Sequence, residues 1–276
     1  MARILLGTSG WSYDEWVGPL YLRKGENKLL RYASVFDTVE INSSFYSIPT
    51  ERMILSIMRH VPSDFIFTAK VHQEITHRRL LDISGEGREI MERFLKIMRP
   101  LQKAGMLGCL LLQLPPKLQY SPKRLEMFAG YFSSDWRFAV EFRHDSWLVD
   151  EAFRLLRRLE MGYVVADEPH IPTMLEASTD FAYFRWHGRG ARPWYNYLYK
   201  RRELERFAED VEKVASRVER VYGYFNNHFH GYAVYNCAQV LEMLGLADGR
   251  VIDVRRRAET YLGERGLIEG GGGRLT

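Results

Sequence analysis

The sequence contains only two cysteines and no long apolar run. Cys109 and Cys237 match no metal-ligand or redox spacing, so neither a structural zinc site nor a disulfide framework is expected. We expect both to be buried thiols in a reducing compartment. No stretch of about 18 apolar residues occurs, which excludes a transmembrane helix. Because the first expected strand begins at Ile4, no room remains for a secretion signal, and we expect a cytoplasmic protein.

The sequence has little excess of either sign of charge, and it lacks a glycine-rich nucleotide-binding motif. Lys and Arg total 39 against 35 Asp and Glu, a formal net charge of +4. Such a small positive net charge permits an anionic ligand without requiring one, because net charge bears on association rather than on fold. No G-x-G-x-x-G pattern follows the first strand in the required form. This absence counts against a doubly wound open sheet, which is the competing architecture.

Eight short apolar runs are present instead, and each ends in a polar residue. The segments between them carry apolar residues at the 3.6-residue spacing of amphipathic helices. The runs comprise residues 4–7, 38–42, 65–70, 109–113, 138–143, 163–167, 182–187 and 221–226, and the helical patterns comprise residues 89–104, 121–132, 151–160, 201–218 and 232–244. Strands alternating with helices predict an α/β fold with a parallel sheet, and eight such units form a single TIM-type (β/α)8 barrel.

Two segments depart from this pattern. Residues 168–180 contain Pro169 and Pro172 and are too short for a good crossover helix, so we expect a shortened or irregular sixth helical unit. No linker divides the chain, and we assign residues 1–254 to one barrel domain. Beyond this point the chain turns basic at residues 255–257 and carries a glycine run at residues 270–273, so residues 255–276 are predicted to be a loose tail.

The polar residues at the ends of the runs are expected to share one side of the sheet. Side chains alternate across a strand, so Glu40 and Asn42 face away from Ile41. Closing the strands into a barrel gathers such residues at the C-terminal rim, where barrels of this type carry their active sites. The expected inward-facing rim residues are Ser9, Glu40, Asn42, Lys70, Gln113, Glu141, Arg143, Asp167, Arg185, His187 and Asn226.

Motifs distributed along the chain point to a known family. They include GTSGWSYDEW (7–16), YASVFDTVEINSSFY (32–46), LLQLPP (111–116), AVEFRHDSW (139–147), RWHGR (185–189) and YFNNHFHGYAVYN (224–236). On these residues the chain resembles the YecE-like family, the domain of unknown function number 72, from Gly7 to about Leu244. The resemblance implies a TIM-type barrel, in agreement with the pattern of strands and helices. It implies no particular reaction, so the function has to be argued from the site.

Four rim residues are the candidates for catalysis. Glu40 and Glu141 offer two carboxylates for general acid/base chemistry, as in glycoside hydrolysis, and Asp167 offers a third. Lys70 is expected to hold charge. A Schiff base is the alternative use of its amine, unless nearby carboxylates keep it protonated. A further alternative is that the charged rim residues only form ion pairs with one another, because burying a charge without a partner is costly.

A divalent metal is another use for the same rim. Glu141, Asp167 and His187 are chemically suited to bind such an ion, with Glu40 as a fourth ligand. Only one histidine is predicted on the inner face, however, and the neighbouring arginines would repel a cation. We therefore predict no cofactor and no metal, and keep the metal site as an open alternative.

The loops after the seventh and eighth strands are expected to bind an anion, as such loops commonly bind phosphate in these barrels. Glycines there expose backbone N–H groups, and arginine offers bidentate contacts to phosphate or carboxylate. Trp11 and Tyr46 are aromatic candidates for stacking on a ligand. The expected ligand-binding residues are Ser9, Trp11, Asn42, Tyr46, Gln113, Arg143, Arg185, His187, Gly188, Arg189, Asn226 and Asn227.

Three function classes follow from this pattern. We favour a hydrolase- or isomerase-like enzyme that acts on a small polar molecule bearing a phosphate or a sugar. The alternative is a nucleic-acid-binding or processing barrel that resembles repair endonucleases, because residues 191–202 mix arginine, lysine and aromatic residues. The third class is a non-catalytic binder of small molecules. The expected partner is a small polar or anionic molecule or a nucleic acid, and no membrane is expected.

Overall fold

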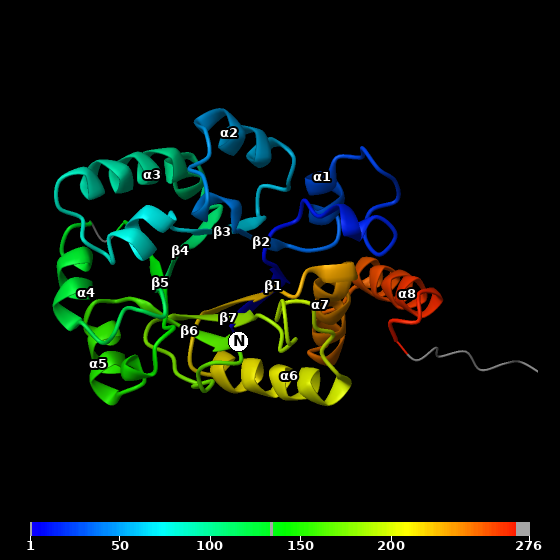
Figure 1. Cartoon of the computed structure of the whole chain (residues 1–276). Coiled ribbons are helices and arrows are strands. Elements are labelled where there is room, and N and C mark those ends of the chain that lie inside the picture. Colours follow the sequence, from blue (N-terminus) through cyan, green and yellow to red (C-terminus); the bar gives the residue numbers. More distant parts are fainter. Residues whose placement is uncertain (1, 133–134, 269–276) are drawn as a thin grey trace, which may run out of the picture.

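Eight parallel strands form a nearly closed barrel with helices around it (Figure 1). The computed structural model describes residues 2–132 and 135–268. The strands follow the order β1-β8-β7-β6-β5-β4-β3-β2 around the barrel. They are β1 (Arg3–Thr8), β2 (Thr38–Ile41), β3 (Ile66–Lys70), β4 (Leu107–Gln113), β5 (Phe138–Glu141), β6 (Gly162–Asp167), β7 (Phe181–Trp186) and β8 (Arg220–Phe225). The predicted TIM-type barrel is confirmed.

Helices follow most of the strands, and every predicted amphipathic segment forms one. They are α1 (Lys28–Ala33), α2 (Glu51–Arg59), α3 (Glu86–Lys103), α4 (Pro122–Ala129), α5 (Asp150–Arg158), α6 (Arg201–Ala215), α7 (Tyr232–Met243) and α8 (Gly249–Glu264). All of residues 168–180 are described and none of them is helical, so the predicted irregular unit between β6 and β7 is confirmed. Among the described residues, no helix combines the length and the apolar character needed to cross a membrane.

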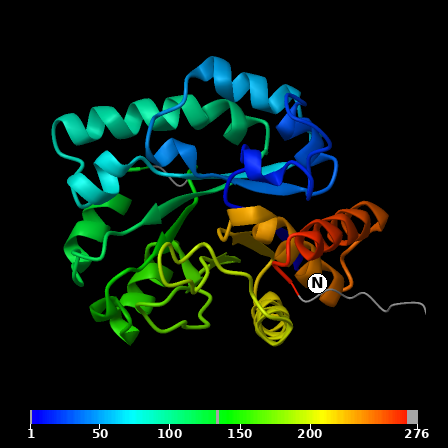
Figure 2. The ribbon, with the colours of Figure 1, turned by 45° about the vertical axis from the view of Figure 1, so that its right-hand side comes forward.

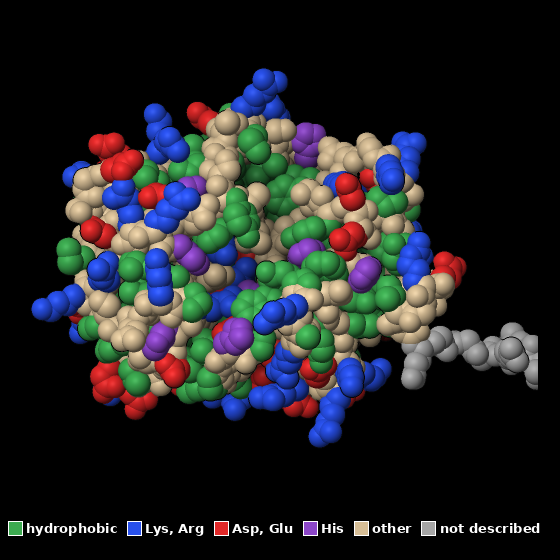
Figure 3. Space-filling model, viewed as in Figure 1, with side chains coloured by type: hydrophobic (Ala, Val, Ile, Leu, Met, Phe, Trp, Pro, Cys, Tyr) green, Lys and Arg blue, Asp and Glu red, His purple; other side chains and the backbone are tan. Residues whose placement is uncertain are grey.

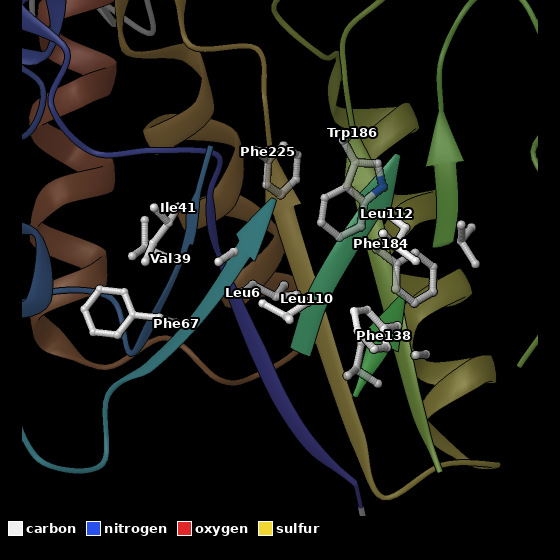
Figure 4. Close-up of a cluster of buried hydrophobic side chains, with 14 of the residues drawn as sticks. Leu6, Val39, Ile41, Phe67, Leu110, Leu112, Phe138, Phe184, Trp186 and Phe225 are labelled. Carbon is white, nitrogen blue, oxygen red and sulfur yellow. The ribbon is translucent and has the colours of Figure 1, made fainter. Parts of the chain in front are cut away.

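Alternate residues of each strand pack outward against the helices. Figure 4 shows Val39 and Ile41 among these side chains. Both belong to one buried cluster with apolar residues of the surrounding helices, such as Phe94 and Phe207. The two-residue repeat sends the intervening Glu40 into the barrel. The apolar area buried between sheet and helices is the main term that stabilises this arrangement.

The interior of the barrel changes from apolar to charged along its axis. Leu5 and Cys109, one of two buried free thiols, belong to an apolar cluster inside the barrel. Nearer the rim, the Thr68 hydroxyl lies 2.9 Å from the hydroxyl of Tyr183. The Tyr183 hydroxyl in turn donates a hydrogen bond to Glu40 Oε2 at 2.6 Å. A layer of hydroxyl groups therefore separates the apolar filling from the charged residues of the C-terminal rim.

One junction of the barrel is closed largely by a side chain. β1 and β2 are joined by an isolated bridge between Ser9 and Glu40 rather than by a continuous ladder. The Tyr32 hydroxyl accepts a hydrogen bond from the Thr8 N–H at 2.9 Å and donates one to the Thr38 carbonyl at 3.0 Å. This junction brings the ends of the two strands together, and with them the Ser9 and Glu40 side chains.

The last helix corrects the prediction of a loose tail that begins at residue 255. Residues 255–264 belong to α8, which lies beside α7 on the outside of the barrel (Figures 1 and 2). Its buried residues are Val251, Val254, Ala258 and Leu262, which recur at helical spacing. The basic run suggested a solvated segment, but Arg255 lies 2.8 Å from a carboxylate oxygen of Glu242 on α7. The glycine run at residues 270–273 lies outside the described residues.

The docking of α8 predicts a measurable contribution to stability. Leu262 is fully buried and packs in a cluster with Tyr232 of α7. We expect Leu262→Ala to lower the free energy of unfolding by about 2–5 kcal/mol, measured by urea denaturation, because it removes a buried side chain and leaves a cavity. Leu246→Ala is the control, since Leu246 is 46% exposed and should change stability by less than about 0.5 kcal/mol. Equally small effects of both substitutions would contradict the docking.

Candidate functional site

Arg185 near the end of β7 is the centre of a buried ion network. Its Nη1 donates hydrogen bonds to Glu141 Oε2 at 2.7 Å and to Gln113 Oε1 at 3.0 Å. Its Nη2 donates to Glu40 Oε1 at 2.7 Å and to Ser9 Oγ at 3.2 Å. Charge-assisted contacts of this kind are among the strongest hydrogen bonds in proteins. A single guanidinium group thus joins β2 to β5 across the barrel.

Arg143 extends the network just beyond the end of β5. Its Nε donates to Glu141 Oε1 at 2.5 Å, and its Nη1 donates to Glu168 Oε2 at 3.2 Å. Its Nη2 lies 2.8 Å from His187 Nε2. The other ring nitrogen, His187 Nδ1, lies 3.0 Å from Asn226 Nδ2. Because both nitrogens of the imidazole are engaged, the ring is held in one orientation.

The network holds its members in fixed protonation states. Burial opposes charge on Glu141, but the guanidinium groups of Arg143 and Arg185 outweigh it and hold the pKa of this carboxyl well below its usual range. Burial also opposes charge on Arg185, but Glu40 and Glu141 outweigh it and raise the pKa of the guanidinium. Burial, together with Arg143 and Arg185, lowers the pKa of His187 to about 3, so its imidazole is neutral at physiological pH.

A cavity of about 440 Å³ lies above this network at the C-terminal rim. Figure 3 shows Lys and Arg side chains set back near the middle of this face, with hydrophobic side chains around them. The lining residues are Tyr13, Asn42, Phe45, Tyr46, Lys70, Gln73, His77, Gln113, Arg143, Arg185, His187, Trp194, Tyr195, Asn226 and His228. No Asp or Glu is among the described residues that line it, so the charged side chains of its wall are those of Lys70, Arg143 and Arg185.

The two glutamates expected to catalyse lie beneath this cavity. Glu40 and Glu141 have no exposed surface, and neither is among the described residues of the lining. Glu141 stays ionised and each of its oxygens accepts a hydrogen bond from a guanidinium group, so it has no proton to donate. One guanidinium also fills the space between the two carboxylates, where glycoside hydrolysis would require the substrate. In this structure both glutamates hold the arginines in place, and their catalytic role stays a prediction.

Lys70 at the end of β3 is buried but lacks a charged partner. Its Nζ lies 3.8 Å from the centre of the Phe45 ring. Among the described residues, no carboxylate oxygen lies within 4.0 Å of this Nζ. Burial and the Arg185 guanidinium lower the pKa of Lys70 to about 7, although Glu141 and Glu40 act in the opposite direction. A substantial fraction of this amine is therefore neutral at physiological pH.

Most of the predicted site residues meet at this cavity. Those that line it are Asn42, Tyr46, Lys70, Gln113, Arg143, Arg185, His187 and Asn226. Those that lie beneath it, within the ion network, are Ser9, Glu40 and Glu141. Those that do not line it are Trp11, Asp167, Gly188, Arg189 and Asn227.

The prediction that Asp167 shares the hollow with the other rim residues is wrong. In β6, Val164 faces the interior of the barrel and Val165 faces the helices, so alternation sends Asp167 outward as well. Its carboxylate accepts a hydrogen bond from the Tyr199 hydroxyl at 2.6 Å and pairs with Arg189. The polar residue that ends β6 therefore faces the opposite side of the sheet from Glu40 of β2 and from Glu141 at the end of β5.

The alternative metal site at Glu141, Asp167 and His187 is not assembled. Asp167 lies on the outer face of the sheet, and both oxygens of Glu141 are engaged by arginines. Among the described residues, no group of three or more His, Cys, Asp or Glu side chains is placed to hold a metal ion.

Several residues expected to bind an anion brace the loops instead. The Gly188 N–H donates a hydrogen bond to the Tyr199 hydroxyl at 2.7 Å. Asn227 Nδ2 donates to the Tyr197 carbonyl at 2.9 Å. The carbonyl of Trp11 accepts a hydrogen bond from a buried tyrosine hydroxyl. These contacts fix the shape of the loops around the cavity. Gly188, Asn227 and Trp11 do not line it, and their binding of a ligand stays a prediction.

Phe45, Gln73 and His228 line the cavity although the strand pattern did not indicate them. Each lies in or directly before a short helical turn that follows a strand: residues 43–45, 74–78 and 229–231. The His228 ring stacks on Tyr13, with ring centres 4.5 Å apart and an angle of 9° between the planes. Strand alternation carries no information about such turns. The available signal is the clustering of aromatic and polar residues just after each strand.

Glu141→Gln tests the ion network. The free energy of unfolding at pH 7 is expected to fall by about 3–5 kcal/mol, because two buried arginines lose a charged partner. Since the folded state lowers the pKa of Glu141, its contribution is present above the unfolded pKa of about 4.3 and is lost as the pH falls below it. Urea denaturation should therefore show the advantage of the wild type shrinking between about pH 5 and pH 3.

The control for this substitution is Glu151→Gln. The Glu151 side chain is 60% exposed and pairs with Arg154 at 2.5 Å on the surface. Its loss should change the unfolding free energy by less than about 1 kcal/mol. A loss for Glu141→Gln no larger than that of this control would contradict the network.

Comparisons with known proteins identify relatives over nearly the whole chain. The family model described as "Protein of unknown function DUF72" matches residues 5–260. The UPF0759 protein YunF of Bacillus subtilis (strain 168) is 26% identical over 269 residues, which cover 88% of this chain and 95% of that protein. The UPF0759 protein YecE of Escherichia coli (strain K12) is 30% identical over 144 residues, which cover 51% of this chain and 48% of that protein.

Solved structures share the same barrel. A DUF72 family protein from Thermotoga maritima MSB8 has a TM-score of 0.81 and 34% identity, covering 88% of this chain and 99% of its own. An AP endonuclease, family 2, from Brucella melitensis has a TM-score of 0.52 and 12% identity, covering 90% of this chain and 100% of its own, which shows likeness of fold alone. The resemblance seen in the sequence motifs is confirmed, and the chain belongs to the DUF72 family, a family of unknown function.

Proposed function

We propose that this protein is an enzyme that binds a small polar molecule with an anionic group, such as a phosphate or carboxylate, in the cavity at the C-terminal rim. The observation that carries this proposal is the charge of the cavity wall. Lys70, Arg143 and Arg185 line it, whereas no Asp or Glu does so among the described residues. A concave wall with cationic side chains favours an anionic ligand over a neutral one.

Polar atoms without partners support a ligand at this place. Arg185 Nε, Asn42 Oδ1 and His228 Nδ1 are buried and have no hydrogen-bond partner among the described residues. All three residues line the cavity. A buried polar group without a partner is costly, so a ligand or water that reached these atoms after a small shift of the lining would complete their hydrogen bonding.

Aromatic rings make the other part of the wall. Tyr46 is 67% exposed, and Trp194 and Tyr195 come from the loop that follows β7. The Arg143 guanidinium lies 6.0 Å from the centre of the Trp194 ring. Such rings cover the apolar faces of a sugar or another small ring and exclude water from it. A cationic floor with aromatic sides suits a phosphorylated or carboxylated sugar-like molecule.

Lys70 is the group with the protonation behaviour that acid/base chemistry needs. A catalytic acid or base works best when its pKa lies near the operating pH, and the pKa of Lys70 is about 7. His77, which also lines the cavity, has a pKa lowered to about 4 by burial and by the neighbouring Lys70, so its imidazole is neutral. These two residues replace the buried glutamates as the candidates for proton transfer in a hydrolase- or isomerase-like reaction.

Anion binding can be tested directly. Inorganic phosphate and glucose 6-phosphate are expected to bind in titration calorimetry, whereas glucose is not. Gln73→Glu places a carboxylate on the cavity wall and should weaken the affinity for phosphate about tenfold or more, because like charges then face each other.

The matched control is Gln102→Glu on α3, where the amide of Gln102 donates to the Asp135 carbonyl at 3.2 Å and does not line the cavity. Its affinity for phosphate should equal that of the wild type. Equal affinities in both variants, or no binding of either phosphate compound, would refute the proposal. Tight binding of an oligonucleotide that weakens steeply with salt would favour the nucleic-acid alternative instead.

The charge of Lys70 predicts how affinity depends on pH. Sulfate stays doubly charged near neutral pH, so a change in its affinity reports on the protein. Because the ammonium is present below a pKa of about 7 and lost above it, sulfate affinity should fall as the pH rises from about 6 to about 8. Lys70→Met should remove most of this dependence in the same calorimetric titration. A wild-type affinity that does not change with pH would contradict the assigned pKa.

A further inference from the structure

Lys70 differs from the two arginines of the cavity wall in its contacts. Arg143 and Arg185 each donate hydrogen bonds to glutamate oxygens. Lys70 Nζ instead lies 3.8 Å from the centre of the Phe45 ring, with no carboxylate oxygen of the described residues within 4.0 Å. Nearby carboxylates were expected from the sequence to keep this lysine protonated, but the guanidinium groups engage them. The amine is thus left facing the cavity without a counter-ion.

The backbone and the surrounding rings hold this amine in place. Ser44 Oγ donates to the Ile41 carbonyl at 2.8 Å and lies 2.7 Å from the Lys70 carbonyl oxygen. These contacts tie the helical turn after β2 to the end of β3 and set the Phe45 ring against Nζ. The His77 ring packs on Phe45 with its centre 4.8 Å away. A side chain that is held in this way and only 6% exposed is preorganised for reaction.

The surroundings also favour the nucleophilic form of the amine. Burial and the positive charge of Arg185 disfavour the ammonium ion and lower the pKa of Lys70. A lysine in an apolar pocket or beside another cation is the form of this residue that attacks carbonyl groups. Arg143 and Arg185, which line the same cavity, would hold the anionic end of a ligand and bring its other end to Nζ.

We propose that Lys70 forms a Schiff base with a small anionic carbonyl compound, such as a keto acid or a keto phosphate. This inference rests on the proposed anion-binding function and adds a covalent step to it. The neutral Nζ attacks the carbonyl carbon, a C–N bond forms, and one N–H proton moves to the oxygen to give a carbinolamine. An added proton then removes the hydroxyl group as water while the nitrogen lone pair forms the C=N bond, which leaves an iminium ion. No electrons are gained or lost in the sequence.

Reductive trapping tests this step. The full chain is incubated with pyruvate, or with dihydroxyacetone phosphate, and sodium cyanoborohydride, which reduces an iminium ion to a stable amine. Intact mass spectrometry should show an increase equal to the mass of the carbonyl compound less one oxygen atom, and peptide mapping should place it on Lys70. Labelling by only one of the two compounds would identify a carboxylate or a phosphate as the anionic group.

Lys28 is the matched control. It also lies beside an aromatic ring, 5.8 Å from the centre of Tyr21, but it pairs with Asp14 at 2.5 Å. Its labelling should be at least about tenfold slower than that of Lys70, because its Nζ pairs with a carboxylate and it does not line the anion-binding cavity. Lys28→Arg should be labelled like the wild type, and Lys70→Met should lose the label while its urea unfolding curve shows that it is folded.

Absence of an adduct on Lys70, or labelling no faster than that of Lys28, overturns the Schiff base. Calorimetry with inorganic phosphate on the same protein separates the two proposals. If phosphate still binds, the anion-binding function stands without the covalent step. If neither phosphate nor the carbonyl compounds bind, both proposals fail together.

Discussion

The buried guanidinium of Arg185 is the constraint on which the rest of the site depends. A fully buried positive charge is destabilising unless it is matched and its hydrogen bonds are satisfied. Here Glu40 of β2 and Glu141 of β5 match it at 2.7 Å each. Because these strands are not neighbours, the contact can form only across the interior of a closed barrel. The same contact draws both carboxylates beneath the cavity and leaves the arginines at its floor.

The character of Lys70 follows from this arrangement of charges. The carboxylates that would stabilise an ammonium ion are already engaged by Arg143 and Arg185. Lys70 therefore has an aromatic ring and two like charges as neighbours, and its amine loses its proton more readily than a solvated lysine. We therefore expect the reactive amine of the site to be that of Lys70, the cationic lining residue that is not part of the ion network.

The barrel was predictable because eight alternating runs must each bury one face, and the same alternation places Glu40, Lys70 and Arg185 on the inner side. The prediction from alternation fails for Asp167, because the last residue of β6 faces the helices rather than the interior of the barrel. Alternation gives only the direction of a side chain, whereas the partner depends on how strands far apart in the sequence meet. The sequence therefore located the charged rim but not which carboxylates would be buried under arginines.

Elements outside the strands were harder to foresee. The stripe of apolar residues in α8 begins before the expected end of the domain and continues through a basic run, so composition suggested a solvated segment. Phe45 and His228 reach the cavity from single helical turns, whose direction depends on local backbone hydrogen bonds rather than on a repeat. The positions of the short turns and of the terminal helix are therefore the parts of the fold that the sequence pattern predicted least well.

The junction between β1 and β2 gives the barrel one compliant edge. Seven pairs of neighbouring strands are held by ladders of hydrogen bonds, whereas this pair relies on one bridge and the Tyr32 hydroxyl. Local opening of the barrel should be most frequent at this junction, because the fewest backbone hydrogen bonds must break there. Because Glu40 lies at this junction, we expect such an opening to move Glu40 relative to Arg185, whereas Glu141 belongs to a strand that is paired on both sides.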